Sequence, residues 1–237
     1  MNAQLIEVRE VAESTLGFVL ETDQPIQFQA GQTCDISILN PKYQDEHGNA
    51  RTFSIASAPA DAPRLQFATR MSQSAFKRTL AEAQRGLELD VDGPYGSFTL
   101  HRNANRPAVF FAGGIGITPF RSIVKDATER RLTHSLTLFY SNRSPRSTAF
   151  LPELEQWERQ NTNFRLLATI TDTPYDAGWT RQTGFIDRDF VARHLAVFGD
   201  AVSYIAGPPA FVTAVRGVLE GAGADPDNIR TEEFSGY

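Results

Sequence analysis

The chain has 237 residues, and its 41% of hydrophobic and 22% of charged residues are typical of a folded protein rather than a disordered one. A formal net charge of −5 argues against nucleic acid as the main partner, because phosphate backbones are bound by clustered positive charge. The single cysteine, Cys34, excludes an internal disulfide and a four-cysteine iron–sulfur cluster within the chain. There is no signal-peptide pattern and no apolar run of roughly 18 residues, so we expect a cytoplasmic protein without a membrane span.

The first hundred residues contain short strand-like runs separated by turn residues such as Gly31, Pro41, Gly48, Pro59 and Gly93. Strands are expected at 4–10, 15–21, 33–39, 52–56, 64–70 and 87–91. Strands at this spacing, without regular helices between them, predict a small antiparallel barrel or sandwich. The polar tract 40–50 is expected to be a mobile surface loop.

One helix is expected within this half. Ser74 is a candidate N-cap, Phe76 and Leu80 are apolar residues at helical spacing, and Gly86 ends the run. Hydroxyl and N–H groups at the start of this helix, with Arg70 just upstream, suggest an anion site. An ordinary capped helix is the simpler alternative.

The run Arg51, Thr52, Phe53 and Ser54 adds evidence for a ligand. Arg51 and Phe53 share one face of the expected strand, and Ser54 begins the next step of the pleat. A guanidinium can bind a diphosphate through two N–H groups, an aromatic ring can stack on a flat heterocycle, and a hydroxyl can hydrogen-bond a ring nitrogen.

The segment 107–124 has the pattern of a strand, a glycine turn and a helix. The apolar run 108–112 leads into Gly113, Gly114 and Gly116, and apolar residues then recur at helical spacing. Such a turn directs backbone N–H groups at one point, which suits a pyrophosphate. Pro119 stands where a third glycine is usual, and no acidic residue follows about twenty positions later, so an unspecialised strand-to-helix turn is equally compatible with the pattern.

The rest of the chain alternates helices and strands. Helices are expected at 117–131, 148–160, 190–198 and 209–219, and strands at 135–140, 164–170, 202–206 and 229–234. With the strand 108–112 this pattern predicts a five-stranded parallel sheet whose ligands lie at the carboxyl ends of the strands. The histidines at 47, 101, 134 and 194 show no metal-binding spacing, so no metal site is expected.

Several short motifs, in this order and spacing, resemble those of the ferredoxin–NADP reductase superfamily of flavoprotein reductases. They are RTFS at 51–54, TRMSQS at 69–74, GPYGSF at 93–98, GGIGITP at 113–119, AGPP at 206–209 and EEF at 232–234. The resemblance runs from about residue 5 to residue 234. It implies an FAD-binding antiparallel Greek-key β-barrel at 1–103 and an NAD(P)-binding, Rossmann-like α/β domain at 104–237.

The resemblance also implies which residues contact the cofactors. The expected FAD contacts are Arg51, Thr52, Phe53, Ser54, Thr69, Arg70, Met71, Ser72, Ser74, Thr118, Phe234 and Tyr237. The expected NAD(P) contacts are Gly113, Gly114, Gly116, Ile117, Thr118, Pro119, Ser141, Asn142, Arg143, Arg146, Ala206, Gly207 and Pro208.

Within that set the resemblance gives some residues roles. Arg51 is expected at the FAD pyrophosphate and Phe53, which replaces the usual tyrosine, at the isoalloxazine or ribityl group. Ser54 is expected near flavin N5, the atom that accepts hydride, and Glu232 is expected to relay a proton or hold the nicotinamide amide. Phe234 is expected to shield the flavin, with Tyr237 as a rival for this role. Many members have a cysteine where this chain has Ala206, so no thiol is expected in the mechanism.

The implied activity is transfer of hydride from NAD(P)H to FAD, followed by single-electron release to a separate carrier such as a ferredoxin, a flavodoxin, a Rieske protein or an oxygenase component. Lys77, Arg78 and Arg85 are candidates for seating an acidic ferredoxin, with an exposed helix face as the plainer explanation. Two other readings stay open: a reductase of free flavin or ferric chelates, and a flavin electron-transfer subunit that does not oxidise NAD(P)H.

The coenzyme choice depends on the tract 141–147. Arg143 and Arg146 can pair with the 2′-phosphate of NADPH, and no carboxylate is evident in this tract to accept from the 2′-hydroxyl of NADH. This favours NADPH, while a solvated basic loop that accepts NADH is the alternative.

Overall fold

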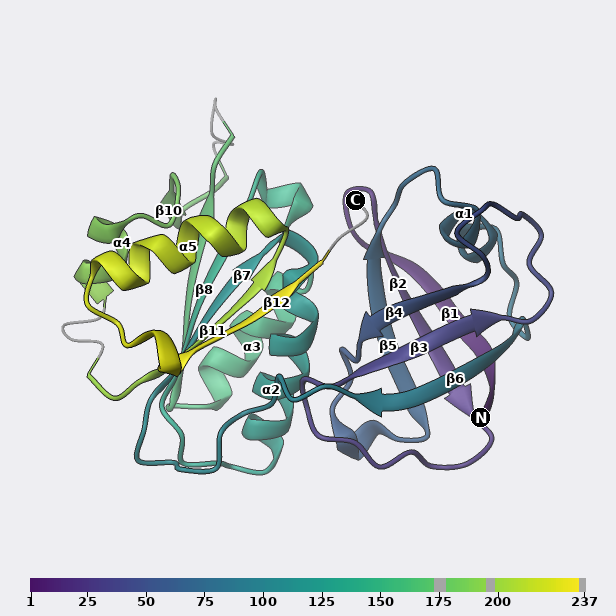
Figure 1. Cartoon of the computed structure of the whole chain (residues 1–237), viewed down its shortest axis with the longest axis horizontal. Helices are drawn as coiled ribbons and strands as arrows, with labels where there is room; N and C mark the ends of the chain where they lie inside the picture. The colour runs from purple at the N-terminus through teal and green to yellow at the C-terminus, as the bar shows by residue number, and fades with distance from the viewer. Residues whose placement is uncertain (173–177, 195–198, 235–237) are drawn as a thin grey trace.

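The computed structural model describes residues 1–172, 178–194 and 199–234, and it shows two halves that lie side by side (Figure 1). The first half is built of antiparallel strands and the second of a parallel sheet covered by helices, which confirms the expected two-part β and α/β architecture. The expected boundary at residues 103/104 falls in the connection between the two sheets, at 96–107, and its placement there stays a prediction.

Six antiparallel strands form the first sheet, in the order β4-β3-β6-β1-β2-β5. They are β1 (Asn2–Ala12), β2 (Thr15–Thr22), β3 (Thr33–Ile38), β4 (Ala50–Ser54), β5 (Arg64–Arg70) and β6 (Glu88–Tyr95). The chain just after β4 meets β5, where the N–H of Ala56 donates to the carbonyl of Gln66 at 2.8 Å, so the sheet curls into the expected barrel. Helix α1 (Ala75–Ala81) connects β5 to β6, and side chains such as Phe18, Leu20 and Phe67 fill the interior completely shielded from solvent.

Strand β6 continues past a glycine that the sequence suggested as a turn. Gly93 lies within β6 and has φ of 147°, and a Cβ there would come within 2.9 Å of the Cys34 Sγ on β3. The glycine therefore serves the close approach of two strands rather than a chain reversal.

The second sheet has six parallel strands in the order β10-β9-β8-β7-β11-β12. They are β7 (Ala108–Gly113), β8 (Leu136–Asn142), β9 (Phe164–Ile170), β10 (Gln182–Thr183), β11 (Val202–Gly207) and β12 (Ile229–Glu233). The sequence predicted five of these. The sixth, β10, is an exposed edge strand of two residues that carries no apolar run to reveal it.

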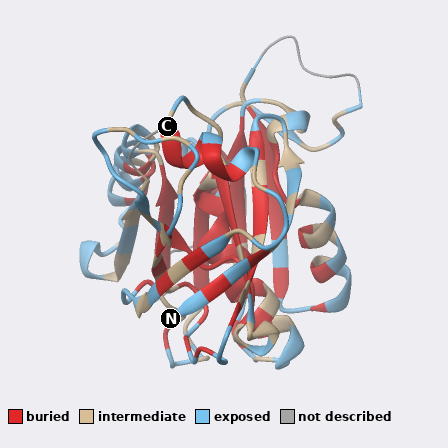
Figure 2. Cartoon of the chain, turned by 90° about the vertical axis from the view of Figure 1, so that its right-hand side faces the viewer, coloured by how far each residue is buried: buried red, intermediate tan, exposed pale blue. Residues whose placement is uncertain are grey.

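Helices cover both faces of this sheet (Figures 1 and 2). They are α2 (Ile117–Glu129), α3 (Leu151–Gln160), α4 (Arg188–His194) and α5 (Pro209–Gly221). Neighbouring residues of β7 point to opposite faces: Phe110 packs with the core that contains α2 and α3, and Phe111 with the core that contains α4 and α5. Because β7 is buried on both faces, it has the continuous apolar sequence of a central parallel strand.

The helices lie where the sequence predicted them, but α3 and α4 begin at residues that differ from the predicted ones. α3 begins at Leu151 rather than at residue 148, because Phe150 takes a left-handed conformation and Pro152 occupies the first turn. α4 begins at Arg188, and the expected continuation over 195–198 lies outside the described residues. Within the described part of the chain, no helix has both the length and the apolar character needed to cross a bilayer.

Helix α2 joins the two halves through buried polar contacts. The guanidinium of Arg121 donates to the carbonyl of Ala56 in the first half at 2.6 Å and pairs with Glu153 of α3, also at 2.6 Å. The hydroxyl of Ser122 donates to the carbonyl of Ser57 at 2.6 Å, and Lys125 pairs with Asp61 at 2.5 Å. These contacts fix the barrel against the glycine turn from which α2 starts.

We predict that Arg121→Met lowers the free energy of unfolding by about 3 kcal/mol, because it removes a buried cation and leaves Glu153 and the Ala56 carbonyl without this partner. Arg130→Met is the matched control: Arg130 is the C-cap of α2, its side chain is 63% exposed, and its ion pair with Asp126 reaches back only one turn of the same helix. Arg130→Met should lower the free energy of unfolding by less than about 0.5 kcal/mol. Urea unfolding of both variants measures the difference, and equal effects would contradict the role given to Arg121.

Candidate functional site

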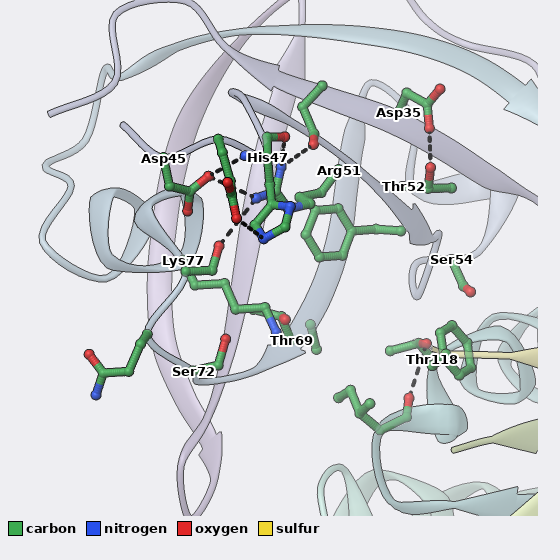
Figure 3. A pocket seen from close by; sticks show the side chains of 18 residues that line it. Asp35, Asp45, His47, Arg51, Thr52, Ser54, Thr69, Ser72, Lys77 and Thr118 are labelled. Atoms are coloured by element: carbon green, nitrogen blue, oxygen red, sulfur yellow. Dashed lines mark hydrogen bonds and ion pairs between the residues drawn. The ribbon is translucent and has the colours of Figure 1, made fainter. Parts of the chain in front are cut away.

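A cavity of about 1110 Å³ opens between the barrel and the carboxyl end of the parallel sheet (Figure 3). This volume lies slightly above the usual range for ligand pockets and suits an extended ligand. The lining comes from both halves of the chain. Its residues are Asp35, Asp45, Glu46, His47, Ala50, Arg51, Thr52, Phe53, Ser54, Ala68, Thr69, Ser72, Gln73, Ser74, Lys77, Ile115, Thr118 and Phe234.

Strand β4 supplies the central wall. All four residues of the RTFS run line the cavity, as the sequence suggested. The Phe53 ring is 9% exposed and packs edge-on against Phe18 at 5.4 Å between ring centroids. Most of this ring therefore belongs to the barrel core, and only its rim is available to a ligand.

One end of the cavity is cationic. Arg51, Ser72, Ser74 and Lys77 gather there, whereas Arg70 and Met71 are not in the cavity wall. The Lys77 Nζ donates to the carbonyl of Arg70 at 2.8 Å, and burial, followed by the charge of Arg51, lowers the Lys77 pKa. A site that holds two neighbouring cations partly out of water is suited to an anion with more than one charge.

Lys77 corrects a prediction. The sequence made Lys77, Arg78 and Arg85 candidates for seating an acidic ferredoxin, with an exposed helix face as the plainer explanation. Lys77 fits neither, because it is only 8% exposed and lines the cavity, while Arg78 and Arg85 are exposed. The available signal was its position three residues after Ser74, which puts both on one side of the helix.

The opposite end of the cavity meets the glycine turn. Gly113 ends β7, and Gly114, with φ of 55°, begins a short 3-10 turn that leads into α2. A Cβ at Gly116 would come 2.2 Å from the carbonyl oxygen of Ala206, so the turn packs backbone to backbone against the end of β11. Thr118 lines the cavity, whereas Ile117 and Pro119 are buried in the first turn of α2.

The other residues expected at the nicotinamide nucleotide follow the ends of neighbouring strands. Ser141 and Asn142 are buried at the end of β8, and Ser141 pairs in register with Gly113. Ala206 and Gly207 end β11, where Ala206 pairs with Ala112, and Pro208 precedes α5. Arg143 and Arg146 are exposed on the connection after β8.

A hydrogen bond between the halves closes this end of the cavity. The Ser54 hydroxyl on β4 donates to Oε1 of Glu232 on β12 at 3.0 Å. The Oε2 of Glu232 is closed off from solvent and has no hydrogen-bond partner within the described part of the chain. Burial raises the Glu232 pKa to about 7, against which the Ser54 hydrogen bond acts. At neutral pH this carboxyl therefore holds a proton on a substantial fraction of molecules.

Phe234 lies next to this pair. Its N–H donates to the carbonyl of Gly207 at 3.0 Å, and it lines the cavity beside Ile115 and Thr118. Its expected rival, Tyr237, lies outside the described residues.

Comparison with known proteins finds similarity to nucleotide-dependent oxidoreductases. Residues 110–217 match the model of the oxidoreductase NAD-binding domain. The phenol hydroxylase P5 protein of Acinetobacter pittii is 27% identical over 234 residues, which are 98% of this chain and 65% of that protein. The chain thus spans slightly less than two thirds of that relative's length.

Solved structures agree over nearly the whole chain. The ferredoxin reductase of carbazole 1,9a-dioxygenase superimposes with a TM-score of 0.81 at 26% identity, over 99% of this chain and 69% of that one. A ferredoxin NADP+ reductase from Neisseria gonorrhoeae, solved with bound FAD and NADP, gives a TM-score of 0.80 over 98% of both chains. At 19% identity the second match concerns the fold alone.

The Glu232 carboxyl predicts a specific pH dependence of stability. In the unfolded chain it ionises near its ordinary pKa of 4.5, but in the folded protein it keeps its proton up to about pH 7. The folded state therefore binds more protons in this interval, and its stability falls as the pH rises from 5 to 7.5. Glu232→Gln cannot titrate and should lose less stability over the same interval.

Thermal unfolding at several pH values measures this difference. The exposed neighbour Glu233 provides the control, since Glu233→Gln should follow the wild-type profile. Indistinguishable profiles for wild type and Glu232→Gln would show that the buried carboxyl does not titrate as described.

Proposed function

We propose that the chain is a member of the ferredoxin–NADP reductase superfamily, and that it oxidises NAD(P)H, collects the electrons on FAD and passes them singly to a separate carrier. The observation that carries the proposal is the contact between Ser54 of the barrel and Glu232 of the sheet. It brings a hydroxyl and a buried carboxyl to the place where a ligand of the barrel and a ligand of the sheet would meet.

The residues of the cavity fit FAD. Arg51, Lys77 and the hydroxyls of Ser72 and Ser74 offer cations and donors to a diphosphate. Thr69 offers a further hydroxyl near Lys77, and Ser54 offers one at the Glu232 end, where the flavin ring is proposed to lie.

The sheet end fits a nicotinamide dinucleotide. Within the glycine turn at 113–116, Gly114 and Ile115 are partly exposed at the end of the sheet, and α2 begins directly behind them. The ends of β8 and β11 flank this turn in register. Ligands of open α/β sheets bind at such carboxyl ends.

FAD, when bound, supplies the chemistry of accepting two electrons as hydride and releasing them one at a time. The protein's own contribution is to position groups and exclude water. The Ser54 hydroxyl donates to Glu232 and leaves its oxygen as an acceptor for a ligand, and Glu232 holds a proton on a substantial fraction of molecules at neutral pH. Phe234 covers this part of the cavity and has to move aside for a nicotinamide ring, which makes it a gate.

The electron acceptor is proposed to be a one-electron carrier outside these 237 residues. With a single, buried cysteine, the chain cannot itself ligate a four-cysteine iron–sulfur cluster. The name of one solved relative links it to carbazole 1,9a-dioxygenase, and that of another relative to phenol hydroxylase. We therefore propose a ferredoxin or an oxygenase component as the acceptor.

Anaerobic titration tests the function. The FAD-loaded protein should lose its visible flavin absorbance on addition of NADH or NADPH, and should then reduce an iron–sulfur carrier faster than free flavin or a ferric chelate. Failure of both coenzymes to bleach the flavin would refute the reductase proposal. Faster turnover with small acceptors would refute only the proposed carrier.

For the coenzyme we propose a preference for NADPH, supported by the two exposed arginines after β8, Arg143 and Arg146. Asp172 is the opposing group: its N–H donates to the carbonyl of Arg143 at 2.9 Å, which brings an exposed carboxylate next to the same loop. The arginines would serve a 2′-phosphate and Asp172 a 2′-hydroxyl.

We predict that Arg143→Ala lowers the ratio of kcat/KM for NADPH over NADH by about tenfold, the effect of losing one charge-assisted contact. Asp172→Asn should move the ratio in the opposite direction. Steady-state kinetics with both coenzymes measures it. An unchanged ratio in Arg143→Ala would remove the case for NADPH.

A further inference from the structure

The polar tract 40–50 is folded onto α1 instead of extending into solvent. The N–H of Tyr43 donates to the Thr79 hydroxyl at 3.0 Å, and the phenol of Tyr43 donates to the Glu82 carboxylate at 2.9 Å. Lys42 also pairs with Glu82, and the Arg78 guanidinium lies 4.0 Å above the Tyr43 ring. These contacts deliver residues 45–47 to the wall of the main cavity.

Asp45 is the residue that this segment places at the cationic end. Its Oδ2 accepts from the N–H of Ala75 at 2.8 Å, and its Oδ1 accepts from the N–H of His47 at 3.0 Å and lies 3.7 Å from Nη2 of Arg51. The Ala75 hydrogen bond is the main reason why the Asp45 pKa lies below its ordinary value. The side chain is therefore an anion at neutral pH. Figure 3 shows Asp45, His47 and Arg51 together, away from Ser54 and Thr118.

The same segment also engages Arg51. Nη1 of Arg51 donates to the carbonyls of His47, Gly48 and Ala50 at 2.9, 3.1 and 2.6 Å, and Nη2 lies 3.4 Å from the Ser74 hydroxyl. Nη1 has only two N–H groups, and both are directed at carbonyls of the segment. A diphosphate that binds through Nη1 therefore has to replace these carbonyls.

We propose that the Asp45 carboxylate occupies the position of a phosphate group in the FAD diphosphate site, and that residues 40–48, which lie between the paired strands β3 and β4, form a lid which the FAD diphosphate displaces. This inference rests on the proposed function, because it takes FAD to be the ligand. The Asp45 carboxylate binds the Ala75 amide and faces the Arg51 guanidinium, two donors that a phosphate group would use. It keeps the cationic end neutralised while no ligand is bound.

The lid makes FAD binding weaker and slower than the cavity alone would allow. When the lid is open in only a fraction of the protein molecules, the apparent dissociation constant of FAD is the intrinsic constant divided by that fraction. Removing the Asp45 charge raises the open fraction. The segment thereby determines how readily the protein takes up and releases its flavin.

The first test compares FAD binding to the apoprotein of wild type, Asp45→Asn and Glu46→Gln by quenching of flavin fluorescence. Asp45→Asn should lower the FAD dissociation constant by about tenfold, a loss of one charge-assisted contact of the closed lid. Glu46→Gln is the matched control, because Glu46 also lines the cavity, but its side chain is 88% exposed and it makes neither the Ala75 nor the Arg51 contact. Riboflavin, which has no phosphate, should bind wild type and Asp45→Asn equally.

The possible results distinguish a failure of the lid proposal from a failure of the reductase proposal. Equal FAD affinity of wild type and Asp45→Asn, or equal tightening by Glu46→Gln, overturns the lid while the reductase proposal stands. Tightening of riboflavin along with FAD also overturns it, because the effect would then not depend on the diphosphate. A wild-type protein that binds no FAD overturns both proposals.

Hydrogen exchange on the wild-type protein gives a second readout that needs no variant. FAD should slow amide exchange in 51–54, which lines the cavity, but should accelerate it in 45–48, whose contacts the ligand breaks. Slower exchange in both segments would mean that the ligand binds beneath a closed lid, and would refute the displacement.

Discussion

The site depends on how α2 is fixed to the barrel. Arg121 and Ser122 hold the carbonyls of Ala56 and Ser57, and these residues follow Ser54 directly along the chain. The same helix begins at the glycine turn that ends β7. One rigid element therefore sets the distance between Ser54 of the barrel and the end of the sheet, where Glu232 lies in register with Ala206. The 3.0 Å contact between Ser54 and Glu232 is a consequence of this arrangement.

The cavity has two ends of opposite electrostatic character. Arg51 and Lys77 make one end cationic, and Asp45 is the anion that faces it. At the other end burial raises the Glu232 pKa to about 7, and the Ser54 hydroxyl, a neutral donor, is the group that acts against this rise. A long ligand with a charged middle and a flat uncharged ring satisfies both ends at once. This division explains why polar residues of such different kinds line a single cavity.

The sequence predicted the elements well because their signals are local. Continuous apolar runs identified β7 and β9, and the glycines at 113–116 located the turn on which the nucleotide assignment rests. What it did not predict depends on contacts between distant residues. Lys77 belongs to a helix that also carries exposed cations, and only the packing of α1 on the barrel turns it toward the cavity. Asp45 lies in a tract with the composition of a free loop. The residues that hold this tract are 30 or more positions away along the chain: Thr79 and Glu82 bond Tyr43, and Ala75 bonds Asp45. Arg121 likewise gave no signal, since a buried arginine is defined by its partners.

The fixed junction between the two halves and the lid together determine how a ligand can enter the cavity. Opening the cavity by separating the halves would break the buried Arg121 contacts, and losing a partner of a buried ion pair costs about 3 to 5 kcal/mol. Residues 40–48 are held by separate hydrogen bonds, such as those of Tyr43 and Asp45, and by exposed ion pairs such as Lys42 with Glu82. Each of these contacts contributes about 1 kcal/mol. The less costly motion is thus that of the segment, which can exchange the Asp45 carboxylate for a ligand phosphate without disturbing Ser54 and Glu232. A ligand can then enter at the cationic end while the geometry at the reactive end stays as the fold has set it.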